Sequence, residues 1–260
     1  MALLDEFANW VFDLDGTMYV GKEAVPGAPE LVQAANEHAK SVLFVSNDPT
    51  HTSAQLARRL ERLGIDADAD RILHAGLAAA LHLRERGVNS VLALGTDGLV
   101  ETLTATGVDA ERTETLRASN EHVDVDAVVV GLDPHAEIED FNVLLRNWRP
   151  GMPVVACNAD RSYPAKLGPN LGGGSFAAAV GYALDCEITY CGKPSEILFR
   201  EAENMLPDGP TAMLGDSPEA DVAGANAAGW TSVLLSRDSS KPGDPKPVHT
   251  VSDLHKLLES

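Results

Sequence analysis

The sequence has few cysteines and no long hydrophobic run. Its three cysteines, Cys157, Cys186 and Cys191, form no Cys-x-x-Cys pair and leave an odd number. This pattern argues against a disulfide scaffold and is typical of a reducing compartment. No apolar stretch approaches the roughly 20 residues that cross a bilayer. The N-terminal segment MALLDEFANW has no basic region ahead of an apolar one, so it predicts no signal peptide. We therefore expect a cytoplasmic protein with no membrane partner.

Positive charge is also scarce. Lys and Arg together number 20, against 39 Asp and Glu, which gives a net charge of −19. So negative a surface repels the phosphates of nucleic acids, and we expect no nucleic-acid partner. An anionic substrate would need a locally positive site. Apolar residues make up 44% of the 260 residues, which is enough for a sizeable core and excludes wholesale disorder.

Short apolar runs alternate with longer amphipathic ones along the chain. The expected strands are 10–12, 42–45, 91–94, 127–130, 154–156, 212–214 and 232–235. The expected helices are 26–39, 77–86, 137–148, 197–206, 219–228 and 252–258. A further helix is expected to be capped by Thr50 and to end at Gly64. Residues 239–247 are expected to form an exposed loop. This alternation predicts an α/β fold with right-handed crossovers and a parallel sheet. The length suits a large domain with a smaller insertion, and changes in composition near 73–76 and 187–192 suggest its junctions.

The most informative segment is Asp13-Leu14-Asp15-Gly16-Thr17, directly after a strand-like run. Two carboxylates with one residue between them would lie at the carboxyl end of a strand, where open α/β sheets bind ligands. One carboxylate can attack a substrate while the other moves a proton, and a hard cation would relieve their repulsion. An ordinary Asp-Gly turn is the alternative. The complete segment, an apolar strand followed by Asp-Leu-Asp-Gly-Thr, favours a catalytic role over a simple turn.

This segment resembles motif one of the haloacid dehalogenase (HAD) superfamily of phosphohydrolases. Three further segments follow in the order that this superfamily shows. They are Ser46-Asn47 at the end of the next strand, Gly192-Lys193-Pro194 ahead of a helix, and Gly215-Asp216-Ser217 after a strand, with Asp221 five residues beyond Asp216. The resemblance covers essentially the whole chain.

The long interval between Ser46 and Lys193 resembles the type-two cap of this superfamily. Asn158-Ala159-Asp160 followed by Pro164, then Gly172-Gly173-Gly174-Ser175, is similar to the NagD-like, p-nitrophenyl phosphatase branch. The resemblance implies a Rossmann-like parallel-sheet core, the HAD fold, at 1–75 and 189–260, with an α/β cap domain inserted at 76–188. Relatives often dimerise through the cap, which leaves a homodimer open.

The resemblance also implies an activity. The chain would be a Mg²⁺-dependent phosphomonoesterase that acts on a small phosphorylated metabolite (a sugar, polyol or nucleoside monophosphate) through an aspartyl-phosphate. Phosphoryl transfer of this kind depends on positioning and electrostatic stabilisation. A phosphomutase or phosphotransferase of the same fold, or a non-catalytic metabolite-binding protein, is the alternative. Dehalogenase chemistry is disfavoured, because it needs neither a proton donor nor a metal.

Each motif residue receives a role from the resemblance. Asp13 would be the nucleophile and a metal ligand, Asp15 the proton donor and a metal ligand through its backbone carbonyl, and Asp216 a further metal ligand. The phosphate-binding groups would be Lys193, Ser46 and the backbone amide of Asn47. Asp221 would support the site by orienting Lys193. We expect Asn158, Asp160 and Tyr163 to lie on a cap loop that selects the substrate.

Two segments depart from the branch. Asp48 stands where relatives often have Asn, which would disfavour highly charged substrates. Gly172–Gly174 replace a Pro-Gly-x-Gly segment, and we expect them to lead flexibly into a helix at 175–184 rather than to cradle phosphate. His51, His74 and His135 lack metal-ligand spacing, so we expect them at the surface or in loops.

Overall fold

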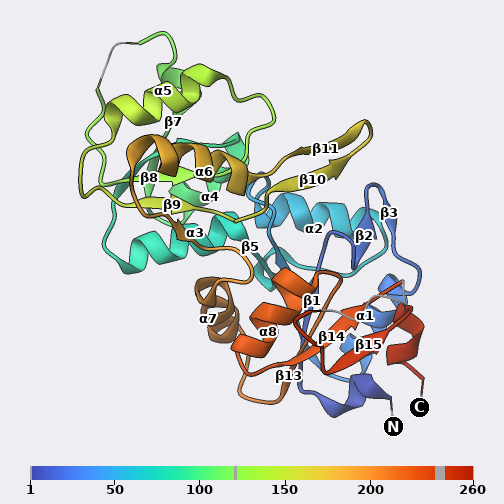
Figure 1. The fold of residues 1–260 in the computed structure, drawn as a ribbon. Coiled ribbons are helices and arrows are strands. Elements are labelled where there is room, and N and C mark those ends of the chain that lie inside the picture. The colour runs from blue at the N-terminus through green and yellow to red at the C-terminus, as the bar shows by residue number, and fades with distance from the viewer. Residues whose placement is uncertain (1, 120–121, 238–243, 260) are drawn as a thin grey trace. The chain divides into compact units, whose positions relative to one another are not determined.

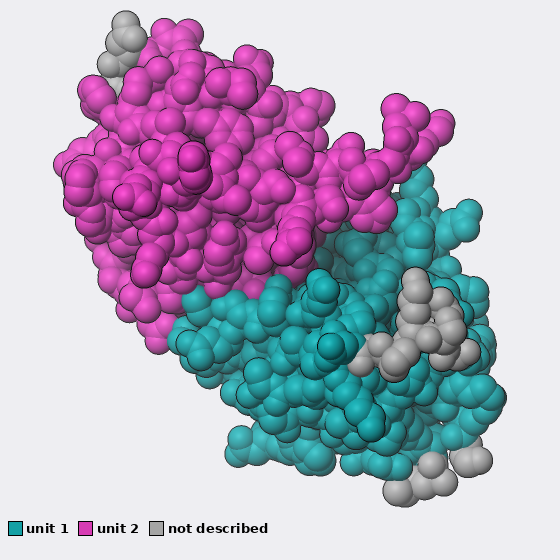
Figure 2. Space-filling model, viewed as in Figure 1, with its two compact units in different colours: residues 1–46, 53–73, 193–260 teal, residues 47–52, 74–192 magenta. Residues whose placement is uncertain are grey.

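The structure is a computed structural model that describes residues 2–119, 122–237 and 244–259. The chain folds into two compact units (Figure 2). Unit 1 comprises residues 1–46, 53–73 and 193–260, and unit 2 comprises residues 47–52 and 74–192. Each unit contains a parallel sheet with helices against it (Figure 1), as the α/β alternation predicts.

Unit 1 is built on a six-stranded sheet with the order β15-β14-β13-β1-β4-β5. Its strands are β15 (His249–Val251), β14 (Thr231–Leu235), β13 (Thr211–Gly215), β1 (Asn9–Asp13), β4 (Ser41–Ser46) and β5 (Ile72–His74). The pairs from β15 through β4 are parallel. All five residues of β1 are buried, which explains why its sequence is a continuous run without polar alternation.

Helices and turns complete unit 1. They are α1 (Ala28–Glu37), α2 (Ser53–Arg62), α7 (Glu196–Met205) and α8 (Ala223–Ala227), with 3-10 turns at Leu3–Glu6, Ala69–Arg71 and Leu254–Leu257 and a short hairpin of β2 (Tyr19–Val20) and β3 (Glu23–Ala24). In the core, the Trp10 ring stacks on Phe12 with the ring centroids 5.8 Å apart, and Phe12 lies tilted against Phe44 with the centroids 6.0 Å apart. Since all three rings are fully buried, each stabilises the sheet by roughly 1.5–3 kcal/mol or more.

Unit 2 has a five-stranded parallel sheet with the order β12-β9-β8-β6-β7. Its strands are β12 (Thr189–Tyr190), β9 (Val154–Ala156), β8 (Ala127–Val130), β6 (Ser90–Leu94) and β7 (Asp109–Arg112), and its helices are α3 (Ala75–Glu85), α4 (Asp97–Ala105), α5 (Ile138–Asn147) and α6 (Gly173–Leu184), with a 3-10 turn at Thr113–Leu116. An antiparallel hairpin, β10 (Ser162–Ala165) and β11 (Gly168–Leu171), precedes α6.

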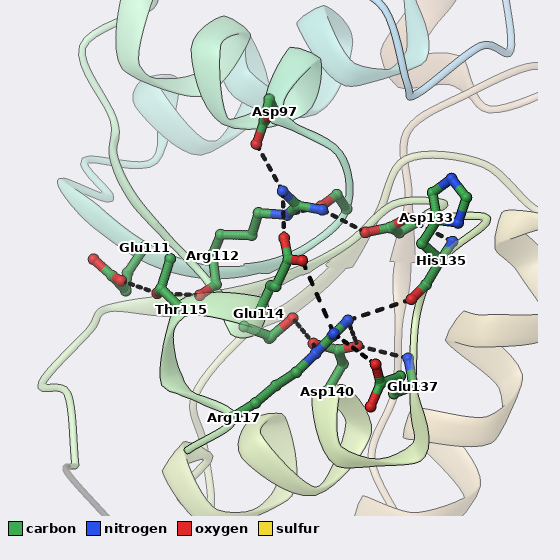
Figure 3. A network of polar contacts seen from close by, with 12 residues as sticks. Asp97, Glu111, Arg112, Glu114, Thr115, Arg117, Asp133, His135, Glu137 and Asp140 are labelled. Atoms are coloured by element: carbon green, nitrogen blue, oxygen red, sulfur yellow. Dashed lines mark hydrogen bonds and ion pairs between the residues drawn. The ribbon is translucent and has the colours of Figure 1, made fainter. Parts of the chain in front are cut away.

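Ion pairs fix the start of α5 in unit 2 (Figure 3). The guanidinium of Arg117 donates to both carboxylate oxygens of Asp140, at 2.9 and 2.6 Å, and Asp140 also accepts from the backbone N–H of Glu137 at 2.7 Å. Burial alone would raise the pKa of Asp140, but these hydrogen bonds hold it below its usual value. Arg112 binds Asp133 at 2.7 Å in the same network. The turn at 113–116 is thereby tied to α5.

The structure corrects some expected helix boundaries. The helix assigned to a Thr50 cap begins at Ser53, because the N–H and hydroxyl of Thr50 both donate to Asp48 Oδ1 at 2.6 Å and form a local turn. The expected helix 219–228 divides into a π-helical turn, Pro218–Val222, and the short α8. The expected terminal helix is only the 3-10 turn Leu254–Leu257, whose two buried leucines follow the three-residue repeat of that turn.

Other positions also differ from expectation. His74 is fully buried rather than at the surface. Burial lowers its pKa to about 4, so the ring is neutral near pH 7. Tyr163 lies in strand β10 rather than in a loop. Residues 239–243 of the expected loop lie outside the described residues. Among the helices that are described, none is both long and apolar enough to cross a bilayer.

Candidate active site

Three adjacent strands of unit 1 bring the first site residues to one edge of the sheet. Asp13 ends β1, Ser46 ends β4 and Asp216 directly follows β13. β1 lies between the other two strands, with Asp13 paired to Val45 and Phe12 paired to Leu214. Since all three strands are parallel, their carboxyl ends lie side by side, where such sheets bind ligands.

Lys193 lies among carboxylates of the same unit. It is close to the start of α7, which Ser195 caps by accepting a hydrogen bond from the N–H of Ile197. The Lys193 ammonium donates to Asp13 Oδ1 and, at 2.7 Å, to Asp221 Oδ1. Burial alone would lower the pKa of Lys193, but the charges of the two carboxylates outweigh it and raise the pKa. The lysine is therefore a fixed positive charge beside Asp13.

Two glycines allow the acidic residues to come this close. Gly16 has a left-handed backbone (φ 95°), and a Cβ there would lie 2.0 Å from Asp216 Oδ2. A Cβ on Gly215 would lie 2.2 Å from Asp221 Cγ. Arg237, which the sequence analysis missed, donates to the Gly16 carbonyl oxygen at 3.1 Å across 221 positions of sequence. Gly16 is thus required for close approach as well as for the turn.

Burial disfavours the ionised form of the Asp13 carboxyl group. Asp13 is 5% exposed, and burial is the main reason why its pKa is raised to about 8. The negative charges of Asp221 and Asp216 act in the same direction, and Lys193 opposes them. The pKa of Asp216 is raised to about 6, by burial and by Asp221. The charged forms of these carboxylates therefore need more positive charge than one lysine supplies.

The donor set fits a divalent cation. Asp13, Asp216 and Asp221 each offer one oxygen, and these three atoms lie within 4.8 Å of one another. Asp13 Oδ2 is buried and has no hydrogen-bond partner among the described residues. Oxygen ligands with two or more carboxylates suit Mg²⁺. If all three acids are ionised, the single positive charge of Lys193 leaves an excess of two negative charges, which a divalent cation would balance.

Asp15 is held by a residue that the sequence analysis missed. Its exposed carboxylate accepts a hydrogen bond from the hydroxyl of Tyr19 at 3.0 Å, and Tyr19 is fully buried. The N–H of Gly16 donates to the Tyr19 carbonyl oxygen at 2.8 Å, which closes the turn between them. The guanidinium of Arg59 lies 4.0 Å from the Tyr19 ring centroid. Only the folded turn reveals this contact, because Tyr19 resembles an ordinary core residue in sequence.

Two of the three expected substrate-selecting residues contact Asn47 within unit 2. The Asn158 amide donates to the Asn47 carbonyl oxygen at 2.6 Å, and the Asn47 amide donates to Asp160 Oδ1 at 3.0 Å. Tyr163 instead accepts a hydrogen bond from Asn170 at 3.2 Å across the β10–β11 hairpin. Their predicted roles in substrate selection remain predictions.

Comparisons with known proteins find HAD-like hydrolases and phosphatases among the relatives of this chain. The family model described as haloacid dehalogenase-like hydrolase matches residues 10–109, and a second model, for HAD-hydrolase-like proteins, matches residues 190–257. An acid sugar phosphatase of Staphylococcus saprophyticus is 29% identical over 98% of both chains.

Solved structures are similar over nearly the whole chain. A glycerol phosphate phosphatase of Mycobacterium tuberculosis in complex with magnesium has a TM-score of 0.86 and 28% identity, over 99% of this chain and 78% of that one. A p-nitrophenyl phosphatase of Archaeoglobus fulgidus has a TM-score of 0.83 and 27% identity, over 97% and 98% of the two chains. With the motif residues assembled at the edge of the unit 1 sheet, these likenesses show that the chain is similar over nearly its whole length to HAD-like hydrolases, among them p-nitrophenyl phosphatases.

Proposed function

We propose that this protein is a Mg²⁺-dependent phosphatase that hydrolyses a small phosphate monoester through an aspartyl-phosphate on Asp13. The observation that carries the proposal is the environment of the Asp13 carboxylate. One oxygen accepts a hydrogen bond from Lys193, and the other is buried without a partner among the described residues. A buried carboxylate with one free oxygen at the end of a central strand is placed to act as a nucleophile.

The chain's own residues supply the chemistry in two steps. A carboxylate oxygen of Asp13 attacks phosphorus and forms the new O–P bond, while the ester P–O bond breaks and Asp15 gives its proton to the leaving alkoxide. Asp15 then takes a proton from water, which attacks the same phosphorus and releases inorganic phosphate and free Asp13. The exposed position of the Asp15 carboxylate leaves it accessible to a leaving group and to water.

Positive charge and hydrogen-bond donors hold the phosphoryl group. Lys193 places an ammonium beside Asp13, and Ser46 and the backbone amide of Asn47 follow at the end of the neighbouring strand. Donors directed at the three equatorial oxygens stabilise the charge that spreads over them. Asp221 keeps Lys193 in place by accepting its second hydrogen bond.

Asp13 and Asp216, with the backbone carbonyl of Asp15, would hold Mg²⁺. The ion, when bound, supplies the positive charge that lets an anionic phosphate approach ionised carboxylates. The fit rests on the unpartnered Asp13 oxygen and on the raised pKa values of Asp13 and Asp216. The magnesium complex of the mycobacterial glycerol phosphate phosphatase also supports it.

The relatives narrow the class of substrate. Those described above are named acid sugar phosphatase, glycerol phosphate phosphatase and p-nitrophenyl phosphatase. We propose a sugar or polyol phosphate as the natural class, with residues 1–75 and 189–260 as the catalytic core and 76–188 as an inserted cap. A cytoplasmic location and a homodimer remain predictions from the sequence.

A panel of phosphate esters tests the proposal. Release of inorganic phosphate is measured with p-nitrophenyl phosphate, glycerol 3-phosphate, sugar phosphates and nucleoside monophosphates, each with Mg²⁺ and with EDTA. We expect Mg²⁺-dependent turnover, with the highest kcat/KM for a sugar or polyol phosphate. No phosphate release from any ester would refute hydrolysis. Transfer of phosphate between sugar positions without release would support a mutase instead.

A further inference from the structure

Asn47 is bound at two points by the segment that follows strand β9. Asn158, which is 3% exposed, donates its side-chain N–H to the Asn47 carbonyl oxygen at 2.6 Å. Asp160 accepts from the Asn47 side chain at 3.0 Å, and its own backbone N–H donates to Asn158 Oδ1 at 3.3 Å. The three residues form a hydrogen-bonded cluster inside unit 2, which holds both the backbone and the side chain of Asn47.

Two glycines lie so close to this cluster that a side chain at either position would collide with it. A Cβ on Gly192 would lie 2.7 Å from Asn47 Oδ1 and 3.1 Å from the Asn158 Cβ. A Cβ on Gly173 would lie 2.8 Å from Asn158 Oδ1. Such distances exclude any larger residue without movement. This gives Gly173, at the start of α6, and Gly192, next to Lys193, a reason for being glycine that does not involve binding phosphate directly.

The geometry of the peptide bond links this cluster to the phosphate-binding turn. The carbonyl oxygen of Asn47 and the N–H of Asp48 belong to one planar trans peptide group and point in opposite directions. Anchoring the oxygen therefore fixes the plane of the peptide group that follows Asn47 and so restricts the rotation of the Asn47 backbone. Asn47 follows Ser46 directly, so fixing the Asn47 backbone restricts the turn in which both proposed phosphate donors lie.

We propose that Asn158, assisted by Asp160, is a positioning residue that fixes the Asn47 backbone and so prepares the Ser46–Asn47 turn to bind the phosphoryl group. This inference rests on the proposed function and deepens it. Both side-chain polar atoms of Asn158 are engaged within the cluster. To reach a substrate, this buried amide would have to give up those hydrogen bonds and leave buried polar groups unpaired, which is unfavourable.

A positioning role and a substrate-selecting role predict different measurements. The phosphoryl group is common to every ester and to inorganic phosphate, so loss of positioning weakens all of them by a similar factor. A residue that touches the leaving group affects esters unequally and leaves inorganic phosphate unchanged. A purely structural residue lowers the melting temperature without changing phosphate affinity in the folded protein.

The test uses Asn158→Asp in the full chain, because it keeps the size and the Oδ1 acceptor but turns an oxygen toward the Asn47 carbonyl. Calorimetry with Mg²⁺ gives the affinity for inorganic phosphate, and kinetics give kcat and KM for p-nitrophenyl phosphate and glycerol 3-phosphate. We expect phosphate affinity to fall about tenfold, equivalent to about 1.4 kcal/mol. KM should rise by a similar factor for both esters. Asn142→Asp, on α5, is the matched control and should change neither quantity.

A second variant keeps the test decisive if Asn158→Asp does not fold. Asp160→Ala removes the carboxylate that accepts the hydrogen bond of the Asn47 side chain, at a partly exposed position, and should weaken phosphate binding about twofold to tenfold. Unchanged phosphate affinity in the folded variants, or a KM change confined to one ester, would overturn the inference. If the wild-type protein binds phosphate but turns over no ester, the proposed function fails, and the comparison of affinities still decides the role of Asn158.

Discussion

Replacing Asp13 with Asn separates catalysis from stability at the proposed nucleophile. The amide has almost the same shape as the carboxylate, but it is a poor nucleophile and carries no charge. We expect phosphatase activity to fall by at least about 10³-fold, or about 4 kcal/mol of transition-state stabilisation. The variant should nevertheless remain folded.

The direction of the stability change follows from the pKa of Asp13. Burial raises this pKa from 3.8 to about 8. A raised pKa means that the folded chain holds the proton more tightly than the unfolded chain, so stability is lost as the pH rises from about 4 to about 8. At pH 7 the unfolded carboxyl group is ionised, and the loss amounts to about 4 kcal/mol. Asn carries no charge and avoids this loss of stability, although leaving its side-chain N–H buried without a partner lowers stability by about 1–3 kcal/mol. The metal-free variant should therefore be more stable than wild type by about 1–3 kcal/mol.

Urea unfolding in EDTA, at pH 5 and at pH 8, checks this expectation. The gain in the free energy of unfolding caused by Asp13→Asn should be larger at pH 8 than at pH 5. A variant that is less stable than wild type at pH 8 would contradict the electrostatic reasoning. A folded variant with unchanged turnover of p-nitrophenyl phosphate would rule out an aspartyl-phosphate on Asp13. Since the variant is expected to gain stability, loss of activity cannot be attributed to unfolding.

Three further outcomes are expected. Tyr19→Phe removes the hydroxyl that donates to Asp15, so kcat should fall about tenfold with little change in KM, as steady-state kinetics would show. Asp140→Asn removes the bidentate partner of the Arg117 guanidinium, which keeps Glu137 and Glu114 nearby, and should lower the free energy of unfolding at pH 7. Because the pKa of Asp140 is depressed in the folded chain, this difference should disappear as the pH falls below about 4, and urea titrations that show no such convergence would refute the assignment. Mg²⁺ should raise the melting temperature of wild type more than that of Asp216→Asn, and equal shifts would exclude Asp216 as a ligand.

The main strands and the site residues at their ends were predictable because their physical signals are local. A strand buried on both faces needs a continuous apolar run, as β1 and β4 show, and a polar residue that ends such a run lies at the edge of the sheet. Which of these strand ends meet was implied by the resemblance to the HAD superfamily, through the order of Asp13, Ser46, Lys193 and Asp216. The structure places Asp13, Ser46 and Asp216 at the ends of adjacent strands and bonds Lys193 to Asp13.

Several features could not be predicted, because they depend on burial or on a choice between competing hydrogen bonds. His74 is fully buried, and nothing in its neighbours along the chain indicates this. Thr50 bonds Asp48 rather than capping a helix, since a local turn competes with the cap. The π-helical turn at 218–222 includes Asp221, which accepts hydrogen bonds from Lys193 and from the Ser217 N–H. Such competition is settled only by the tertiary contacts.

By itself the sequence determined the α/β alternation, the acidic character and the chemical types of the site residues, because periodicity, charge and side-chain chemistry belong to each segment alone. Only the tertiary structure decided the raised pKa of Asp13, the second hydrogen bond of Lys193 and the contacts that hold Asp15 and Asn47. The reason is that burial and hydrogen-bond geometry depend on which distant segments pack together, and both act over a few ångströms.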